Sequence, residues 1–369
     1  MAILKNLNKS EFLILSEKMK VLLALNHAPD YREPFFRELG NQVDLTVIAQ
    51  PCPEDNLTPP EERVGYKIYE IPTYRLKGLF WQPGLSSILG KEHWDIICFD
   101  LNPRQLSWIV QFLMDRKLWK KWVWRGRFFG GNTSSILDNF RKHLIKRSAG
   151  CLTYNEPIAQ RIRDEYKVDA VSFNNTQVCQ ADFRPGVFPE HSGIRLLFVG
   201  RNQPRKRLQR LIELAARRQD IHIRLIGPGM ESLEAPSQLV AEKRVQIYGR
   251  LVGDDLNEHF DWTDLVCCPG DVGLLVMHAA QNGKGIVIDA NSNHGPEYWL
   301  AQESGQPFVD FSKQEDVDSF LDHILVHKQK LLHFGETLQN VAREQYTIEY
   351  MAKIHHNFFQ KVISCSKKH

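Results

Sequence analysis

The chain has 369 residues, of which 43% are hydrophobic and 25% charged, and its formal net charge at neutral pH is +3. This balance excludes an intrinsically disordered protein, and no global field demands nucleic acid as a partner. The length exceeds one typical hydrophobic core, so we expect two domains of roughly 150–190 residues.

The cysteines indicate a reducing compartment. None of the seven forms a Cys-x-x-Cys pair, and Cys98, Cys267 and Cys268 lie in apolar runs typical of buried strands. We therefore interpret them as buried free thiols. The sequence shows no signal peptide, and its apolar runs are far shorter than the roughly 20 residues of a membrane span. These features predict a cytoplasmic protein, which could also lie on the inner face of the membrane.

The first half of the chain alternates apolar runs with helical periodicity. Residues 1–18 are predicted as a leader, with Met19 as an alternative start, and residues 19–180 as the N-terminal domain. Strands are predicted at 21–26, 43–49, 96–99, 122–124 and 151–154, and helices at 34–40, 105–118, 136–147 and 157–166. Repeated strand–helix units favour a parallel sheet with helices on both faces.

A second series of the same kind follows a cluster of prolines and glycines. Residues 181–193 are predicted as a linker, 194–345 as the C-terminal domain and 346–369 as a final helix. Strands are predicted at 194–199, 221–226, 245–248, 265–268 and 285–290, with helices starting near 208, 231, 254, 273, 296 and 314. We therefore expect an α/β fold of two doubly wound, Rossmann-like domains facing across a cleft, which is where ligands favour binding.

Cationic side chains follow the first strand of the second series. In Gly200-Arg-Asn-Gln-Pro-Arg-Lys206 the glycine makes the turn, and Arg201 and Lys206 stand between strand and helix. A guanidinium and an ammonium converging there would neutralise a diphosphate leaving group. The neighbouring Arg205, Arg207 and Arg210 are instead interpreted as a solvated helix face.

Three more turns are candidates for the same edge of the sheet. Gly227 and Gly229 follow one strand and Arg250 follows the next, so they are candidate walls of a nucleoside site, with simple chain reversal as the alternative. The turn formed by Asp271, Val272, Gly273 and Leu274 leads into a helix. A helix start leaves free N–H groups and a partial positive charge, which suit a diphosphate.

Taken in order, these motifs resemble a known family. They are Gly-Arg-x(4)-Lys, Ile-Gly-Pro-Gly, Gly-Arg-Leu, Pro-Gly-Asp-Val-Gly-Leu-Leu-Val-Met-His-Ala and His-Gly-Pro-Glu. The set is similar to the retaining glycosyltransferases of the GT-B fold, family 4, firmly over 194–325 and more loosely over 20–180. The resemblance implies a UDP- or GDP-linked sugar donor held by the second domain. It also implies a glycan or lipid-linked glycan acceptor in cell-surface polysaccharide synthesis, and neither cofactor nor metal.

Two positions of the donor motif depart from that family, which typically has a Glu-x(7)-Glu pair here. Its first Glu falls at Gly270, which cannot replace a carboxylate, although Asp271 is adjacent. Its second falls at His278, which could bond a ribose hydroxyl or simply pack in the core. Glu297 could cap the following helix or offer a carboxylate to the site.

The N-terminal half departs as well. The family often has a Trp-Gly-His-Gly-like segment, but this chain has Trp-Val-Trp-Arg-Gly-Arg, so Arg125 or Arg127 replaces the His. An arginine can stabilise a phosphate but cannot act as a base at neutral pH. His27, at a strand end, is a candidate catalytic residue on the acceptor side. Asn102 and Arg104, after another strand, are acceptor-side candidates, with loop capping as the alternative.

Aromatic and basic residues alternate between residues 117 and 127. The residues are Lys117, Trp119, Lys120, Lys121, Trp122, Trp124, Arg125 and Arg127. Core packing, an anionic membrane surface and a nucleic-acid groove all fit this mix. We favour the membrane over nucleic acid because lipid-linked acceptors are common in the resembled family.

The sequence thus supports a retaining, metal-independent glycosyltransferase as the main hypothesis. A glycosyltransferase-like binding protein without catalysis is the alternative, because the first Glu and the His of the family are missing.

Overall fold

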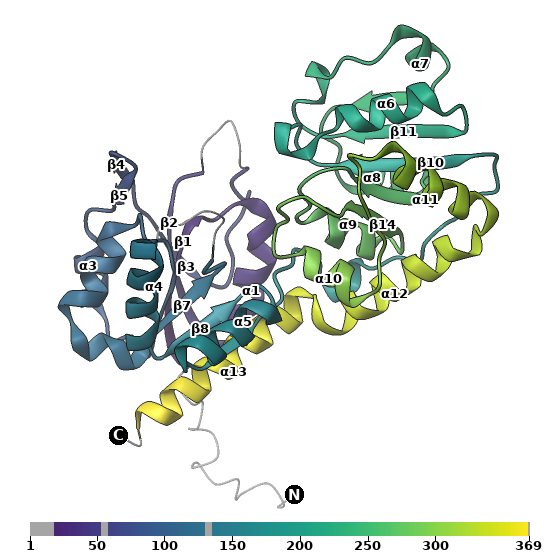
Figure 1. Cartoon of the computed structure of the whole chain (residues 1–369). Helices are drawn as coiled ribbons and strands as arrows, with labels where there is room; N and C mark the ends of the chain where they lie inside the picture. Colours follow the sequence, from purple (N-terminus) through teal and green to yellow (C-terminus); the bar gives the residue numbers. More distant parts are fainter. Residues whose placement is uncertain (1–17, 53–57, 130–134, 368–369) are drawn as a thin grey trace, which may run out of the picture. The chain divides into compact units, whose positions relative to one another are not determined.

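A computed structural model describes residues 18–52, 58–129 and 135–367. They form two compact units (Figure 1). One unit contains the described residues up to Cys151, together with Tyr166–Asp169 and the chain from His356 onward, and the other contains Leu152–Glu165 and Ala170–His355. The predicted leader lies outside the described residues except for Lys18.

The N-terminal sheet has the strand order β3-β2-β1-β6-β7-β8-β9. Its strands are β1 (Lys20–His27), β2 (Asp44–Gln50), β3 (Lys67–Glu70), β6 (Ile96–Asp100), β7 (Trp122–Gly126), β8 (Gly150–Thr153) and β9 (Ala170–Ser172). Strand β1 pairs in parallel with both β2 and β6. Its run Val21–Leu25 is buried throughout, as expected of a central parallel strand covered on both faces.

Four helices of this half were predicted, two of them with interruptions, and α2 (Leu85–Lys91) was not predicted. The predicted ones are α1 (Glu33–Gln42), α3 (Leu106–Met114), α4 (Ser135–Arg147) and α5 (Glu156–Arg161). The helix predicted at 105–118 stops earlier because Asp115 is extended and its side chain caps the N–H of Lys117, starting the 3₁₀ helix η2 (Arg116–Lys121). The helix predicted at 157–166 ends in a π turn, Ile162–Tyr166.

A small hairpin was not predicted. Strands β4 (Tyr74–Leu76) and β5 (Leu79–Trp81) pair in antiparallel fashion. The two residues between them, Lys77 and Gly78, both have positive φ, as a two-residue type I′ turn requires. Most of the hairpin's side chains are exposed, so no apolar run marked it in the sequence.

The C-terminal sheet is parallel and has the order β12-β11-β10-β13-β14-β15. Its strands are β10 (Ile194–Val199), β11 (Ile221–Ile226), β12 (Val245–Tyr248), β13 (Leu265–Cys268), β14 (Gly285–Asp289) and β15 (Phe308–Val309). The predictions for the first four are confirmed, and the fifth was predicted one residue too long. Strand β15 was missed because two residues give no pattern.

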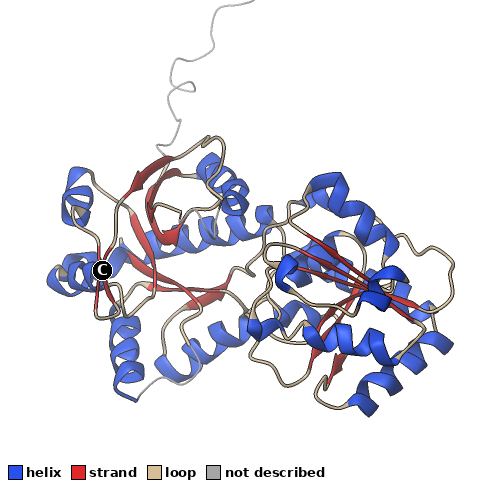
Figure 2. Ribbon diagram, turned by 90° about the horizontal axis from the view of Figure 1, so that it is seen from above, coloured by secondary structure: helices blue, strands red, loops and turns tan. Residues whose placement is uncertain are grey.

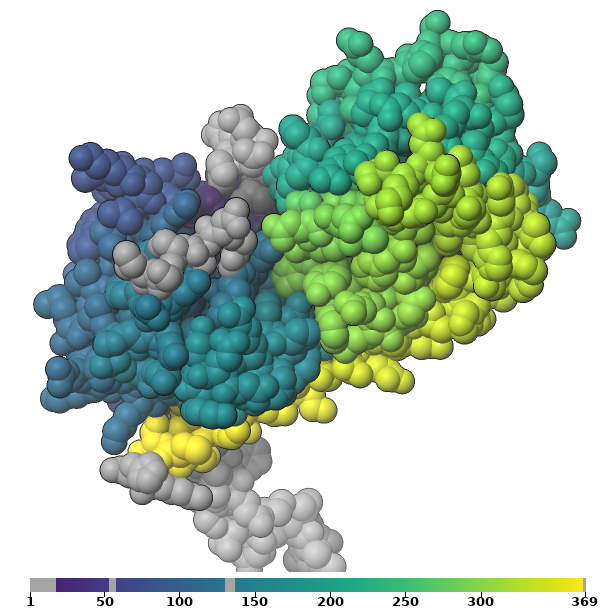
Figure 3. Space-filling view, in the orientation of Figure 1, coloured from purple at the N-terminus to yellow at the C-terminus, as the bar shows by residue number. Residues whose placement is uncertain are grey.

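Helices lie on both faces of this sheet, as Figure 2 shows. They are α6 (Gln209–Arg217), α7 (Ser237–Ala241), α8 (Gly253–Trp262), α9 (Leu275–Gln281), α10 (Tyr298–Glu303), α11 (Gln314–Val326), α12 (Gln329–Gln345) and α13 (Ile348–Ser366). The helix predicted near 231 is only a 3₁₀ turn, Met230–Ser232. The unpredicted α12 packs on α9, α10 and β14, where yellow-green and green surfaces adjoin in Figure 3. The described residues contain no helix long and apolar enough to cross a bilayer.

Candidate functional site

Each sheet has a topological switch point where the strand order reverses. In the C-terminal sheet it lies between β10 and β13, and in the N-terminal sheet between β1 and β6. Ligands of open parallel sheets bind beside the carboxyl ends of strands at such a point. Arg201 and Lys206 follow β10, and the 271–274 turn follows β13, so the two predicted phosphate segments flank the switch point of their sheet.

Lys206 is built into this edge. It ends the 3₁₀ helix Pro204–Lys206, and its Nζ donates to the carbonyl oxygen of Asp271 at 2.6 Å. Burial lowers the pKa of its ammonium, with a smaller effect of Arg205 in the same direction. An ammonium that has lost part of its hydration gains more from an incoming anion than an exposed one.

The 271–274 turn is tied to both neighbouring loops. The N–H of Asp271 donates to the carbonyl of Arg205 at 3.0 Å, and the N–H of Val272 donates to Nδ1 of His294 at 3.1 Å. These two N–H groups are therefore already engaged, so only part of the turn that was predicted to offer N–H groups to a diphosphate can do so. Within the part of the chain that the structure describes, the N–H groups of Gly273 and Leu274 donate to no protein acceptor. Of the four N–H groups of this turn, those of Gly273 and Leu274 can therefore donate to a ligand.

Gly270 stands where the β13 loop touches the β10 loop. A Cβ built on it would lie 2.7 Å from the carbonyl carbon and 2.8 Å from the carbonyl oxygen of Lys206, and closer still to the Arg205 oxygen. Backbone atoms cannot move aside as a side chain can. A glutamate, as in the resembled family, therefore has no room at position 270. The reason is the close approach of the backbones of two loops, and not a single neighbouring side chain.

His278 lies on α9, and its ring points into the protein. Its Nε2 is 2.7 Å from the side-chain nitrogen of Gln177, and its ring stacks at 6.4 Å on Phe260. Burial lowers its pKa to about 4, so the ring is neutral at pH 7. In this conformation Gln177 occupies Nε2, and a ribose hydroxyl would have to replace it or use Nδ1.

Glu297 lies at the start of α10 and is nearly buried. One carboxylate oxygen accepts from the amide of Asn175 at 2.6 Å, while the other lies 4.0 Å from the Cβ position of Gly273. The preceding Pro296 carbonyl accepts from Asn155 at 3.1 Å. Glu297 makes no side-chain cap, so its carboxylate is held beside the 271–274 turn as an acceptor for hydroxyl groups.

The glycine turns bring the β10 and β11 loops together. Gly200 and Gly227 both have positive φ, and a Cβ on Gly227 would lie 2.7 Å from the carbonyl carbon of Gly200. Gly229 also has positive φ, and its carbonyl accepts from Asn202 at 3.1 Å. Arg201 and Arg250 are exposed at the same sheet edge, where a ligand can reach them.

His27 ends β1 at the other switch point. Its Nδ1 lies 3.0 Å from the carbonyl of Pro51, and its Nε2 accepts from Gln50 at 3.0 Å. Both contacts fit the neutral Nδ1–H tautomer, and burial lowers the pKa of the ring. The ring is thus oriented and uncharged, but Gln50 must leave Nε2 before that nitrogen can accept a proton.

The four acceptor-side candidates differ in their surroundings. Arg125 is fully buried and pairs with Asp100 at 2.9 Å, so it lies in the interior and not on the acceptor surface where we expected it. Asn102 caps its own loop by accepting from the N–H of Arg104 at 3.0 Å. Arg104 and Arg127 are exposed.

The alternation of aromatic and basic residues is mostly internal. Trp122 and Trp124 are buried, and Lys121 donates to the carbonyl of Trp94, so core packing, and not a membrane surface, accounts for these residues. Trp119 is half-buried, with the guanidinium groups of Arg116 and Arg147 at 5.7 and 5.4 Å from its ring.

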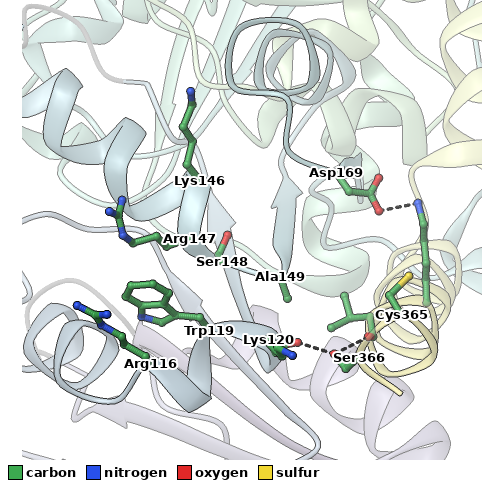
Figure 4. A pocket seen from close by; sticks show the side chains of 12 residues that line it. Arg116, Trp119, Lys120, Lys146, Arg147, Ser148, Ala149, Asp169, Cys365 and Ser366 are labelled. Atoms are coloured by element: carbon green, nitrogen blue, oxygen red, sulfur yellow. Dashed lines mark hydrogen bonds and ion pairs between the residues drawn. The ribbon is translucent and has the colours of Figure 1, made fainter. Parts of the chain in front are cut away.

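These residues border a pocket of about 570 Å³, shown in Figure 4. It lies before β7, β8 and β9, at the amino ends of strands, so it is separate from the carboxyl-end site. In Figure 4 Trp119, Ala149 and Cys365 surround it, while the Lys146 amine and the Arg116 and Arg147 guanidiniums point away from Asp169 and Cys365.

Sequence reasoning missed a charged centre at this edge of the C-terminal sheet. Asp289, at the end of β14, is fully buried and pairs with Arg207 at 3.3 Å and with Arg210 at 3.9 Å. Arg207 and Arg210 are therefore not a purely solvated face. The signal was present, since an aspartate ending an apolar strand needs a partner, but the partners are about eighty residues away.

Comparison with known proteins gives one match to a family model and several to solved structures. Residues 193–326 match the family model of the glycosyl transferases group 1. No curated protein matches the sequence. A glycosyltransferase from Rickettsia africae is 13% identical, with a TM-score of 0.66 over 94% of this chain and 98% of its own. Alr3699/HepE of Anabaena, solved in complex with UDP, is 12% identical, with a TM-score of 0.65 over 93% of this chain and 100% of its own.

WaaG, a glycosyltransferase involved in lipopolysaccharide biosynthesis, is 12% identical, with a TM-score of 0.52 over 92% of this chain and 99% of its own. At this identity the likeness establishes the fold, which is the predicted GT-B fold of two Rossmann-like domains. The chain therefore has the fold of the GT-B glycosyltransferases, and residues 193–326 match the glycosyl transferases group 1 model.

Proposed function

We propose that the protein is a retaining glycosyltransferase of family 4 that transfers a sugar from a UDP- or GDP-linked donor to a glycan or lipid-linked glycan in cell-surface polysaccharide synthesis. The observation that carries the proposal is the pairing of Lys206 with the 271–274 turn across the switch point of the glycosyl transferases group 1 domain. The UDP complex of Anabaena HepE and the role of WaaG support the donor and acceptor classes.

In this proposal the diphosphate lies against Arg201, Lys206 and the N–H groups of Gly273 and Leu274. These donors stabilise the charge that develops on the leaving nucleotide, which is the largest contribution to catalysis in many transfer reactions. Glu297 accepts from hydroxyl groups of the donor. The cations and N–H groups would neutralise the diphosphate charge, which a metal ion does in other enzymes. We therefore expect activity without a metal.

Donor binding is the first test. Isothermal calorimetry on the full chain with UDP-glucose and a GDP-sugar should give saturable binding to one of them at neutral pH with chelator present. Arg201→Ala and Lys206→Ala should each weaken it about tenfold to a hundredfold, because a hydrogen bond to a charged group contributes about 1.5–3 kcal/mol. Lys243→Ala, at an exposed lysine before the amino end of β12, is the matched control. Normal affinity in both site variants would refute the diphosphate assignment.

Release of nucleotide separates the enzyme from its alternative. The absent family glutamate and histidine favour a binding protein without catalysis, and such a protein would bind the donor but release no nucleotide with any glycan acceptor. The anomeric configuration of a product, read by NMR, tests retention directly.

We also propose a cytoplasmic location with peripheral attachment to anionic lipid. The supporting feature is the exposed cationic rim formed by Arg116, Lys120 and Lys146. Co-sedimentation with phosphatidylglycerol vesicles at low salt should fall when all three are changed to alanine. Equal binding to phosphatidylcholine vesicles would contradict it, because the attraction is electrostatic.

A further inference from the structure

His294 is the side chain that fixes the 271–274 turn from the side of β14. Its Nε2 lies 2.8 Å from the carbonyl oxygen of Asp289, and its Nδ1 accepts from the N–H of Val272 at 3.1 Å. The next residue, Gly295, donates its N–H to the carbonyl of Val272 at 2.7 Å. Both backbone polar groups of Val272 are therefore held by two consecutive residues.

Only one form of the ring makes both contacts. Asp289 offers a carbonyl, so Nε2 must carry the hydrogen, and Val272 offers an N–H, so Nδ1 must be a lone pair. A second proton would sit on Nδ1 and face the N–H of Val272, which turns one hydrogen bond into a repulsion between two donors. Burial lowers the pKa of this ring, so the neutral form prevails at pH 7.

Charged and aromatic groups from several elements surround the His294 ring. The charged groups that act on it are Asp271 from the β13 loop, Asp289 from β14 and Lys206 from the β10 loop. Tyr298 of α10 stacks on the ring at 5.6 Å, and Phe308 of β15 meets it edge-on at 6.3 Å. The ring also borders an open pocket of about 490 Å³, so a proton from solvent has access to it.

We propose that His294 is a positioning residue of the donor site: its neutral Nε2–H tautomer holds Val272, and with it the Gly273 and Leu274 N–H groups, in the geometry that binds the donor diphosphate. This inference rests on the proposed function. Protonation of His294 releases Val272, so donor affinity falls on the acid side through the ionisation of one histidine.

Two isosteres separate the two contacts. His294→Asn keeps an acceptor near Nδ1 and cannot be protonated, whereas His294→Gln keeps a donor near Nε2 but loses the acceptor. UDP-glucose is the probe, because both its phosphates are esterified, whereas the terminal phosphate of UDP titrates near pH 6, by analogy with other phosphate monoesters, whose second pKa is about 6. Calorimetric affinities are measured from pH 7.5 to 5.

The wild type should lose affinity as the pH falls through this range, and the loss approaches about tenfold when the ring is fully protonated, as expected when one hydrogen bond of about 1.5 kcal/mol is broken. His294→Asn should bind within about threefold of the wild type at pH 7.5 and show little acid loss, while His294→Gln should be weak at every pH, for the same hydrogen-bond reason. Variants that bind and titrate like the wild type overturn the role of His294 alone. A wild type that binds no nucleotide sugar refutes the donor site and this role together.

A ligand-free readout completes the test. With ¹⁵N-labelled histidine, the His294 signal, assigned by its absence in His294→Asn, should show the Nε2–H tautomer and a pKa below the 6.5 of an unperturbed ring. An Nδ1–H tautomer, or titration at 6.5 or above, overturns the inference whatever the donor does.

Discussion

Gly270→Ala is the most direct test of how the proposed donor edge, formed by the loops after β10, β11, β13 and β14, is built. The added methyl would lie 2.7–2.8 Å from the carbonyl of Lys206 and nearer still to that of Arg205. All three neighbouring atoms belong to the backbone, so relief requires the β10 and β13 loops to separate. That movement breaks the bonds from the Asp271 N–H to Arg205 and from Lys206 to the Asp271 carbonyl.

Overpacking against backbone destabilises a protein by typically 1–3 kcal/mol, and we expect about 3 kcal/mol here because no side chain can yield. For a unit of this size the transition temperature should fall by about 6–12 °C. Scanning calorimetry measures this shift. Gly249→Ala is the matched control, since Gly249 also follows a strand of the same sheet and a Cβ there would meet nothing within 4 Å. The control should change stability by less than about 0.5 kcal/mol.

Donor binding is a second measurement to make on the Gly270→Ala variant. Separation of the loops should weaken nucleotide-sugar binding by more than the control does, because Lys206 and the 271–274 turn move together. A Gly270→Ala protein as stable as the Gly249→Ala protein would refute the close backbone approach. A stable Gly270→Glu protein with tighter donor binding would show that the family's glutamate fits here after all.

Two further predictions concern buried ionisable groups, His278 and the pair of Arg125 with Asp100. His278 has a folded-state pKa of about 4 against 6.5 for an unperturbed ring, so the unfolded chain binds the proton more tightly and stability falls as pH drops below 6.5. The loss should reach about 2 kcal/mol at pH 5 in urea unfolding, and His278→Gln should remove that part of the pH dependence. Arg125→Ala leaves Asp100 without its partner and should cost about 3–5 kcal/mol, whereas Arg127→Ala should leave stability unchanged and affect only acceptor kinetics. Equal melting temperatures for the two arginine variants would contradict the buried pair.

The strand framework could be predicted because its signals are local. Apolar runs such as Val21–Leu25 are buried on both faces, and runs of that kind mark central parallel strands without knowledge of the rest of the chain. Residues that follow such runs must gather at one edge of the sheet, which is how Arg201, Lys206 and the 271–274 turn could be placed together.

The rest depends on partners that are distant in the sequence. Asp100 and Arg125 are neighbours because their strands pair in register. The sequence pattern of neither strand predicts that pairing. The use of the Val272 N–H by His294 likewise depends on how two loops end, as does the exclusion of a side chain at Gly270. Sequence patterns therefore located the edge but could not say which of its polar groups were already engaged.

The close approaches of Gly200, Gly227 and Gly270 give the donor edge a scaffold made of main chain. Loops that touch through their backbones place few demands on the chemistry of the side chains around them. Substitutions at the remaining positions can then change what is recognised while the loops keep their spacing. If the proposed donor site lies here, a framework of this kind makes the edge a suitable place to alter donor preference by design.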